Sequence, residues 1–580
     1  MNKPRLSAPD LAADYYLTNF RFLVSWVLLR YEDLLSSQER QFVSCFQELP
    51  HNSQSLLVRL FSRKGPLFRQ DKLHYPEIDS IAHATEKLIA VGLLSIDELI
   101  SMHEAANLLT KAELLSLFGK HLNGAKQARK DVLVAHLSNI FPEPKTWRDW
   151  TNHQLGEIYH LDSQPIISNL LLLFFGNAYQ DLTEFVLQDL GLYRYENYVV
   201  DPQHRIFKNR EELEQYQQLI QLREHLDHAT DVSHLIQIAN NLPAELPGNA
   251  LTRRRARLCN QLAYELERMN EHHFALQLYR QSYLPPARER CVRLLEKQGE
   301  LRAAWVLLNE ILKTPCNEHE LQVAQRMAPR LAKKVGEPVA RKISTSVTEQ
   351  QVILAKNRNV QGNFFNVEEA VLQFVHTPES PCFYVENVLL TGLFGLWLWP
   401  EMFRGVDGAF ANPFQAAPLD LYQENFVANR PGMALLWQLL DDTQYLDHIR
   451  QYWREKNGIT NHFVNWQFLT EELLELALHA IPASHLKAIF ERLLFDIKSN
   501  RSGLPDLIQF YPANYYPANY HPANYYPATH NSTTHNSKTH SYRMIEVKGP
   551  GDRIQDNQYR WLDYFATKTI PAEVWYVSWE

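Results

Sequence analysis

Hydrophobic residues recur with a helical period through most of the first two-thirds of this chain. Runs such as Phe20–Leu29 and Leu56–Phe61 place apolar side chains three and four positions apart, as on one face of an amphipathic helix. The pattern changes near the C-terminus, where Ile545–Lys548 alternates apolar and charged residues and Glu573–Trp579 is rich in β-formers. We therefore predict a multidomain chain, mainly α-helical first and α/β at its C-terminal end.

A pair of short helices is predicted after the first helical module. Leu108–Phe118 and Arg129–Leu137 each have an amphipathic pattern, and Asn123-Gly124 between them is a turn signal. Basic residues at the start of a helix can present charge and N–H groups to phosphate, although a solvated basic face is the alternative interpretation. The pair resembles a SAP-type DNA-binding hairpin. Its candidate DNA-binding residues are Lys126, Arg129 and Lys130.

The next segment has the pattern of stacked helical hairpins. Asn270–Tyr279 is echoed by Gln298–Leu308, with alanine and large apolar residues at the packing positions. A period of about thirty residues resembles degenerate tetratricopeptide (TPR) repeats. We expect a TPR-like helical block here.

Candidate chemistry lies close to the C-terminus. Pro505-Asp506 is followed later by Glu546-Val547-Lys548, a spacing typical of metal-dependent phosphodiesterases. Residues alternate faces along a strand, so Glu546 and Lys548 point the same way and Val547 points into the core. Two carboxylates suit a hard cation such as Mg²⁺, and a lysine could orient water and stabilise charge on phosphate.

A helix and a further strand are predicted downstream. Asp552 is the expected N-cap after the Gly-Pro-Gly loop, and Ile554, Trp561, Leu562 and Phe565 would share one helical face. The order strand, hairpin, strand, helix, strand suits an α/β nuclease core.

These residues resemble the VRR-NUC branch of the PD-(D/E)XK nucleases, and specifically bacterial relatives of the Fanconi-anaemia-associated nuclease. The resemblance rests on E-V-K-G-P-G-D-R-I-Q-D-N-Q at 546–558 and R-S-G-L-P-D-L-I-Q-F at 501–510. It implies that the Val547 carbonyl adds a metal ligand, that Lys548 is catalytic and that Gln558 faces the site. It also supports phosphate contacts by Lys498 and Arg501.

The family places one further glutamate on an upstream helix. The matching segment begins Val385-Glu386-Asn387 and runs into an apolar stretch at 388–400. Glu386 is therefore the candidate for the third acidic metal ligand, beside Asp506 and Glu546. The alternative is an acid that only opens a buried helix, where it favours the dipole.

The two halves of the predicted site are separated by a repetitive insert. Residues 511–540 parse as pentapeptides such as Tyr-Pro-Ala-Asn-Tyr. Regular prolines oppose a central strand, so we expect an inert, mobile hairpin tip. Two alternatives are stacking of single-stranded DNA on tyrosines and metal binding by histidines. The residues concerned are Tyr515, Tyr516, Tyr520, Tyr525, His521, His530, His535 and His540.

Composition narrows the function classes. The 580 residues carry a net charge of −8, so any DNA contact must be a local basic patch. Five scattered cysteines without CxxC spacing argue against zinc and fit a reducing cytoplasm. The N-terminus lacks the apolar core of a signal peptide, and 388–400 is too short to span a bilayer. We expect a cytoplasmic, nucleoid-associated protein with no membrane contact.

The sequence patterns predict the organisation of the chain, and the family resemblance implies its function. The leading hypothesis is a structure-selective nuclease, a flap endonuclease or 5′–3′ exonuclease, that uses Mg²⁺ or Mn²⁺ to cleave 5′ flaps and branched DNA in repair, including interstrand cross-link repair. The alternatives are a catalytically disabled DNA-binding or scaffold protein and a peptide-binding repeat protein. The domains are 1–95 (helical module), 96–145 (SAP-like hairpin), 146–345 (TPR-like repeats) and 346–580 (VRR-NUC nuclease domain with the insert at 511–540).

Overall fold

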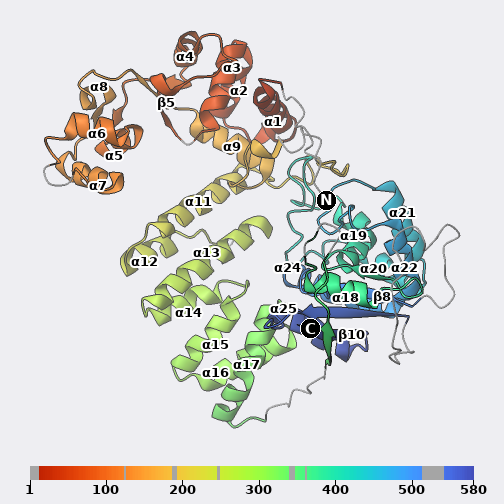
Figure 1. Cartoon of the computed structure of the whole chain (residues 1–580). Helices are drawn as coiled ribbons and strands as arrows, with labels where there is room; N and C mark the ends of the chain where they lie inside the picture. The colour runs from red at the N-terminus through yellow and green to blue at the C-terminus, as the bar shows by residue number, and fades with distance from the viewer. Residues whose placement is uncertain are drawn as a thin grey trace. The chain divides into compact units, whose positions relative to one another are not determined.

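The computed structural model divides into two compact units (Figure 1). The first unit comprises residues 1–194, 200–210 and 411–414, and the second unit holds the rest of the chain. The structure describes residues 12–63, 65–122, 126–185, 193–244, 249–338, 347–358, 362, 364–511 and 541–580. The predicted Asn123-Gly124 turn and almost all of the 511–540 insert lie outside these residues.

The first unit is mainly helical, with two small antiparallel sheets in the orders β1-β5-β2 and β3-β4. Capping boxes begin several of its helices: Ser36 with Glu39 at α2 is one example. The elements are α1 (Tyr15–Tyr31), α2 (Ser37–Glu48), α3 (His51–Phe61), β1 (Leu67–Arg69), α4 (Ile81–Ala90), β2 (Leu94–Ser95), β3 (Leu99–Ile100), α5 (Met102–Leu108), α6 (Lys111–Phe118), α7 (Lys130–Ile140), β4 (Lys145–Thr146), α8 (Trp147–Trp150), β5 (Ile158–Leu161) and α9 (Gln164–Phe175).

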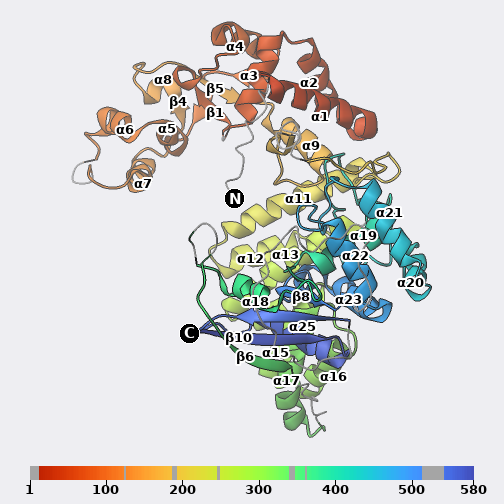
Figure 2. The same ribbon diagram turned by 45° about the vertical axis from the view of Figure 1, so that its right-hand side comes forward.

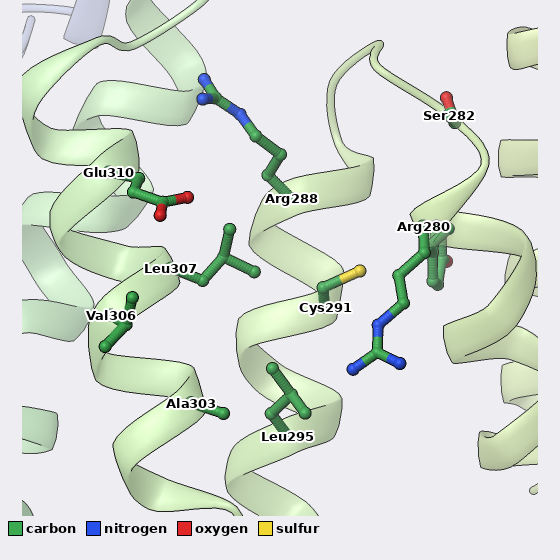
Figure 3. Close-up of a pocket in the computed structure, with 10 residues that line it drawn as sticks. Arg280, Ser282, Arg288, Cys291, Leu295, Ala303, Val306, Leu307 and Glu310 are labelled. Carbon is green, nitrogen blue, oxygen red and sulfur yellow. The ribbon is translucent and has the colours of Figure 1, made fainter.

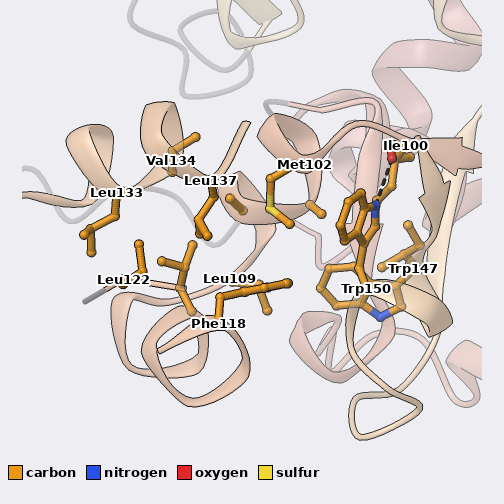
Figure 4. Packing of buried hydrophobic residues seen from close by; sticks show 14 residues of the cluster. Ile100, Met102, Leu109, Phe118, Leu122, Leu133, Val134, Leu137, Trp147 and Trp150 are labelled. Carbon is orange, nitrogen blue, oxygen red and sulfur yellow. Dashed lines mark hydrogen bonds between the residues drawn. The ribbon is translucent and has the colours of Figure 1, made fainter. Parts of the chain in front are cut away.

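The predicted helical pair is present as α6 and α7, packed with α5 and α8 around a separate small core (Figure 4). Leu114 and Leu133 are fully buried in it, and Trp150 donates its indole N–H to the carbonyl of Ile100 at 2.9 Å. A buried indole that finds an acceptor fixes the ring as well as filling space. The hairpin therefore packs into a small core that also includes Ile158 of β5.

The second unit begins with consecutive helices whose neighbours pack on one another (Figure 2). α14 and α16 correspond to the two echoed sequence segments. These helices are α11 (Arg210–Asp227), α12 (Val232–Asn240), α13 (Asn249–Arg268), α14 (His272–Arg280), α15 (Ala287–Lys297), α16 (Leu301–Lys313) and α17 (Glu318–Val335).

A five-stranded mixed sheet follows, in the order β6-β10-β9-β8-β7. β6 and β10 pair in parallel, as do β10 and β9, whereas β8 is antiparallel to both of its neighbours. The predicted order of strand, strand, helix and strand at the C-terminus is confirmed. The elements are β6 (Thr348–Leu354), α18 (Val367–Val375), β7 (Cys382–Tyr384), α19 (Leu389–Met402), α20 (Met433–Asp441), α21 (Tyr445–Glu455), α22 (Glu471–Ala480), α23 (Ala483–Phe495), α24 (Ile497–Asn500), β8 (Leu507–Phe510), β9 (Tyr542–Lys548), α25 (Asp556–Thr567) and β10 (Ala572–Trp579).

The predicted start of α25 was wrong. Its N-cap is Gln555, not Asp552, and Ile554 precedes the helix. The Asp552 carboxylate instead accepts a hydrogen bond from Gly549 N at 3.0 Å, so it closes the Gly-Pro-Gly turn, a use that competes with helix capping. Trp561, Leu562 and Phe565 do share the buried face.

The apolar stretch predicted as a buried helix is α19, in which almost every side chain is buried. Among the described residues, no single helix is long and apolar enough to cross a membrane. The bent pair α22 and α23 meets that length and composition only when taken together across a 108° bend.

Candidate active site

Three neighbouring strands bring the predicted acids to one end of the sheet. Leu507 on β8 pairs with Ile545 on β9, so the antiparallel register places Asp506 opposite Glu546. Tyr384 on β7 pairs with the same Leu507, and Val385 N donates to the Asp506 carbonyl at 2.8 Å. Glu386 therefore follows directly on the strand next to Asp506. Residues distant in sequence meet here because β8 is central to both pairings.

Successive side chains of β9 point alternately to the hydrophobic core and to the face that carries the candidate site. Ile545 and Val547 belong to a hydrophobic cluster that includes Val371 of α18 and Trp575 of β10. Glu546 and Lys548 lie on the opposite face, since successive side chains point to opposite sides of a sheet. The predicted facing of these residues agrees with this packing.

The two central acids are buried and held by short hydrogen bonds. Asp506 is 6% exposed and its Oδ2 accepts from Val547 N at 2.8 Å. Glu546 is 0% exposed, and Lys548 Nζ donates to its Oε1 at 2.7 Å. The ammonium and both carboxylates therefore belong to one buried polar group.

Burial dominates the electrostatics of both acids. It raises the pKa of Asp506 to about 6, with Glu386 and Glu368 adding to the rise and the Val547 N–H and Lys548 opposing it. The pKa of Glu546 is raised to about 8 by burial and by the Asp506 charge, against the opposing effect of Lys548. The folded protein therefore disfavours the ionised form of both acids, because burial and repulsion between the carboxylates outweigh the compensation from Lys548.

Glu386 is held by its own chain neighbours. Tyr384 Oη donates to Glu386 Oε2 at 2.5 Å, and Asn387 Nδ2 donates to Oε1 at 3.2 Å. Burial, followed by the hydrogen bond to Glu386, raises the pKa of Tyr384, so its hydroxyl stays protonated as the donor. Sequence reasoning missed Tyr384, because a tyrosine that ends a short strand carries no motif of its own.

A fourth acid, Glu368, was also missed. It lies in the first turn of α18, which Asn366 and Glu369 begin with a capping box. Its charge contributes to the raised pKa of Asp506. The capping pattern predicts where such a helix begins, but only the three-dimensional packing places Glu368 near the other acids.

The donor atoms fit a hard divalent cation. Oε2 of Glu546 is buried and has no hydrogen-bond partner among the described residues. An unpaired buried carboxylate oxygen is costly, and a cation that prefers oxygen ligands would satisfy it. Within the same residues, no three His, Cys, Asp or Glu side chains converge into a ready-made cage. The fit therefore rests on the chemistry of the donors.

The segment before β8 is fixed against α25. Gly503 has φ +86°, and a side chain there would come within 2.8 Å of the Asn557 backbone. Glycine alone suits this left-handed turn and close approach. Gln558, predicted to face the site, accepts from Gln555 N at 2.9 Å as part of the α25 cap. Its described contacts are those of the helix start.

The predicted phosphate contacts next to the site differ in their surroundings. Lys498 of α24 is exposed. Arg501 Nη1 lies 2.5 Å from Nε2 of His462, which also contacts the Tyr422 hydroxyl. Burial and the Arg501 charge lower the pKa of His462 to about 4, so the imidazole is neutral near pH 7 and Arg501 is the charged member of the pair.

The three basic residues of the helical hairpin cluster at the start of α7. Arg129 is its N-cap residue, and Lys130 Nζ donates to the Asn107 carbonyl at 3.2 Å. None of the three, Lys126 included, has a carboxylate partner among the described residues. They remain available to an external anion.

A cavity of about 490 Å³ lies elsewhere, between α14, α15 and α16 (Figure 3). Its floor is apolar, with Cys291 and Leu295, and its rim carries Arg280, Arg288 and Glu310. It contains none of the paired acids, so it is separate from the candidate active site.

Comparisons with known proteins agree with this geometry. The sequence profile described as "FAN1, HTH domain" matches residues 14–95, "Fanconi anemia-associated nuclease SAP domain" matches 93–150, and "VRR-NUC domain" matches 440–579. The last range contains Asp506, Glu546 and Lys548, whereas Glu386 precedes it.

Whole-chain relatives extend the match. The chain is 39% identical over 583 residues to the "Fanconi-associated nuclease 1 homolog" of Pseudomonas aeruginosa, covering 100% of this chain and 98% of that protein. The homologue from Oryza sativa subsp. japonica is 25% identical, with 62% of its length covered. A crystal structure of paFAN1 bound to 2nt 5′flap DNA with gap superposes with a TM-score of 0.81 at 39% identity, covering 99% of this chain and 100% of that one.

Proposed function

The chain belongs to the Fanconi-associated nuclease family, and on that premise we propose that it cleaves phosphodiester bonds at 5′ flaps and branched DNA during repair, including repair of interstrand cross-links. The observation that carries this proposal is the register of β8 and β9, which sets Asp506 opposite Glu546 with Lys548 bonded to Glu546. Structural acids are normally matched by cations, whereas perturbed and crowded carboxylates mark functional sites. We place the nuclease domain at 346–580, acting at the nucleoid in the cytoplasm.

Asp506, Glu546, Glu386 and the Val547 carbonyl would hold a divalent cation, which we propose is Mg²⁺ or Mn²⁺. Such an ion lowers the pKa of bound water and neutralises charge on phosphate. Lys548 Nζ, within the same buried group, would donate to the attacking water or to a phosphate oxygen as charge develops. Gln558 would assist only if its side chain leaves the α25 cap.

The surrounding cations would hold the substrate. Lys498 and Arg501 lie within a few residues of Asp506, where they can contact phosphates next to the scissile bond. Lys126, Arg129 and Lys130 would hold a duplex arm through the sugar–phosphate backbone. The 39%-identical paFAN1 is bound to 5′-flap DNA in its crystal structure, and we propose the same substrate class here.

The decisive experiment is cleavage of labelled 5′-flap, 3′-flap, splayed and single-stranded DNA, with Mg²⁺, with Mn²⁺ and with EDTA. We expect preferential, metal-dependent cutting of the 5′-flap substrate. Tight binding of all substrates without cleavage under any metal condition would favour the alternative of a catalytically disabled scaffold.

A further inference from the structure

The carboxylate of Glu386 is restrained on both of its oxygens by residues one and two positions away. Tyr384 donates to Oε2 at 2.5 Å and Asn387 donates to Oε1 at 3.2 Å. A hydrogen bond to an ionised group is worth roughly twice a neutral one, so together they restrict the side-chain rotamer. The other two acids are fixed differently, by β8 and β9 themselves.

The backbone places both donors. Tyr384 ends β7 opposite Leu507, one residue from Asp506. Asn387 has φ +51°, a left-handed conformation that asparagine tolerates better than most residues. Its Oδ1 accepts from Leu504 N at 3.4 Å, which links it to the Pro505-Asp506 segment. The two donors are therefore tied to the same strands that carry the acids.

Packing alone does not account for the Tyr384 hydroxyl. The residue is 45% exposed, so phenylalanine would fill the same space. Repulsion among the neighbouring carboxylates provides a reason for the hydroxyl, because a hydrogen bond to Glu386 can oppose it. Strand pairing brings the Glu386 segment next to Asp506, and Asp506 lies opposite Glu546, so the three acids gather at one end of the sheet. Repulsion between neighbouring carboxylates favours rotation of Glu386, the least buried of the three, toward solvent.

We propose that Tyr384 and Asn387 are positioning residues that hold the Glu386 carboxylate beside Asp506 and Glu546 for a divalent cation. This inference rests on the proposed function, because it concerns the same metal site. The Tyr384 hydroxyl and the Asn387 amide offset the repulsion among the acids. Glu386 is therefore already ordered before the cation binds, and binding costs less side-chain entropy.

The test is Mn²⁺ binding to the full-length protein without DNA, measured by titration calorimetry. Tyr384→Phe should weaken Mn²⁺ binding about tenfold, the loss expected for one charge-assisted hydrogen bond. Cleavage should weaken in parallel at low Mn²⁺ and recover at saturating Mn²⁺. Asn387→Gly keeps the left-handed backbone and removes the amide, so it should act in the same direction with a smaller shift.

A matched control is Tyr542→Phe. That hydroxyl lies 2.8 Å from Nδ1 of His485 at the opposite end of β9, so its loss removes one hydrogen bond away from the acids. Mn²⁺ binding should be unchanged. A wild-type isotherm in Tyr384→Phe, or a cleavage defect that saturating Mn²⁺ does not restore, would overturn the inference.

Failure of the inference and failure of the proposed function give different results. If Glu386→Gln abolishes cleavage while Tyr384→Phe binds Mn²⁺ normally, only the positioning role is wrong. If Glu386→Gln also binds Mn²⁺ and cleaves like the wild type, the assignment of Glu386 to the metal site is wrong and both fall.

Discussion

The helical stack and the end of the nuclease sheet both bury carboxylates, but they neutralise them differently. In the stack, Glu320 is 1% exposed and both of its oxygens accept from Arg288, at 3.0 and 2.6 Å. At the sheet, Asp506 and Glu546 share Lys548. In the helical stack the buried carboxylate has its own guanidinium, whereas at the end of the sheet two buried carboxylates have one lysine between them.

Under the proposed function, the difference separates a buried charge that serves folding from buried charges that serve catalysis. A matched pair such as Glu320 with Arg288 satisfies its own hydrogen bonds and fixes one helix against the next. The unmatched acids carry pKa values raised to about 6 and about 8, which means that the folded state disfavours their ionised form. Sites that retain such a penalty are characteristically functional.

The largest expected effect is at the unmatched acids. Asp506→Ala, Glu546→Ala and Lys548→Ala should each lower the cleavage rate about 10²–10³-fold or more, because each removes a group that acts on charge at the phosphate. DNA binding, measured by fluorescence anisotropy, should survive. Undiminished turnover in both acid variants would contradict the site, and near-wild-type turnover in Lys548→Ala would remove that residue from the mechanism.

The matched pair should show the opposite behaviour. Glu320→Ala leaves the partly buried Arg288 with its bonds to the Thr314 carbonyl and Cys316 Sγ but without its carboxylate partner, so the free energy of unfolding should fall by about 2–3 kcal/mol. Cleavage by the folded protein should be unchanged. The control is Arg302→Ala at the exposed Arg302–Glu337 pair, which should change stability by less than about 1 kcal/mol. Loss of cleavage in folded Glu320→Ala would show that the stack is not merely structural.

Local sequence pattern predicted the strand and the helix that carry the candidate site, and the family resemblance supplied the expected roles of its residues. Alternation in Ile545–Lys548 gave the strand and its two faces, and the period of Trp561, Leu562 and Phe565 gave the buried face of α25. Pattern could not place Tyr384 or Glu368. Both reach the site through pairing of β7 with a distant strand and packing of α18, which no local period encodes.

The same limit explains the error at Asp552. Intrinsic preference favours aspartate at an N-cap, and this preference is why the helix was predicted to begin at Asp552. The Asp552 carboxylate instead accepts from Gly549 N in the Gly-Pro-Gly turn, so it is not available to cap α25. Competition between neighbouring turns is settled by geometry that residue preferences do not contain.

The next prediction concerns the positive charges at the start of α7, which have no carboxylate partner among the described residues. Lys126→Ala with Arg129→Ala and Lys130→Ala should weaken binding to duplex arms about 10- to 100-fold at low salt, because phosphate contacts release counterions. The slope of log affinity against log salt should fall by about 2–3. Mn²⁺ binding should stay at the wild-type value. An unchanged salt slope would indicate that the basic residues of α7 form an ordinary solvated helix face and do not contact DNA.

A smaller effect should appear in stability at the acids themselves. Asp506→Asn can keep the bond from Val547 N while it removes one like charge. Since the folded pKa of Asp506 is raised from 3.8 to about 6, wild-type stability is lost as pH rises through that window. In EDTA, the variant should therefore be about 1–2 kcal/mol more stable above pH 6 and equal to the wild type below about pH 4. If Asp506→Asn were less stable than the wild type at pH 8, the inferred repulsion between Asp506 and the neighbouring acids would be wrong.

The smallest expected effect on activity concerns the repetitive insert. Its tip lies outside the described residues, but the hairpin base is regular: Phe510 pairs with Tyr542, and Tyr511 N donates to the Ser541 carbonyl at 2.8 Å. Replacing 512–540 with a four-residue turn should therefore preserve flap cleavage. Loop-closure entropy falls by ~0.6 kcal/mol for each halving of length, so thermal stability should rise slightly. A shortened protein that folds and cleaves normally yet loses affinity for single-stranded DNA would instead assign the tyrosines a stacking role.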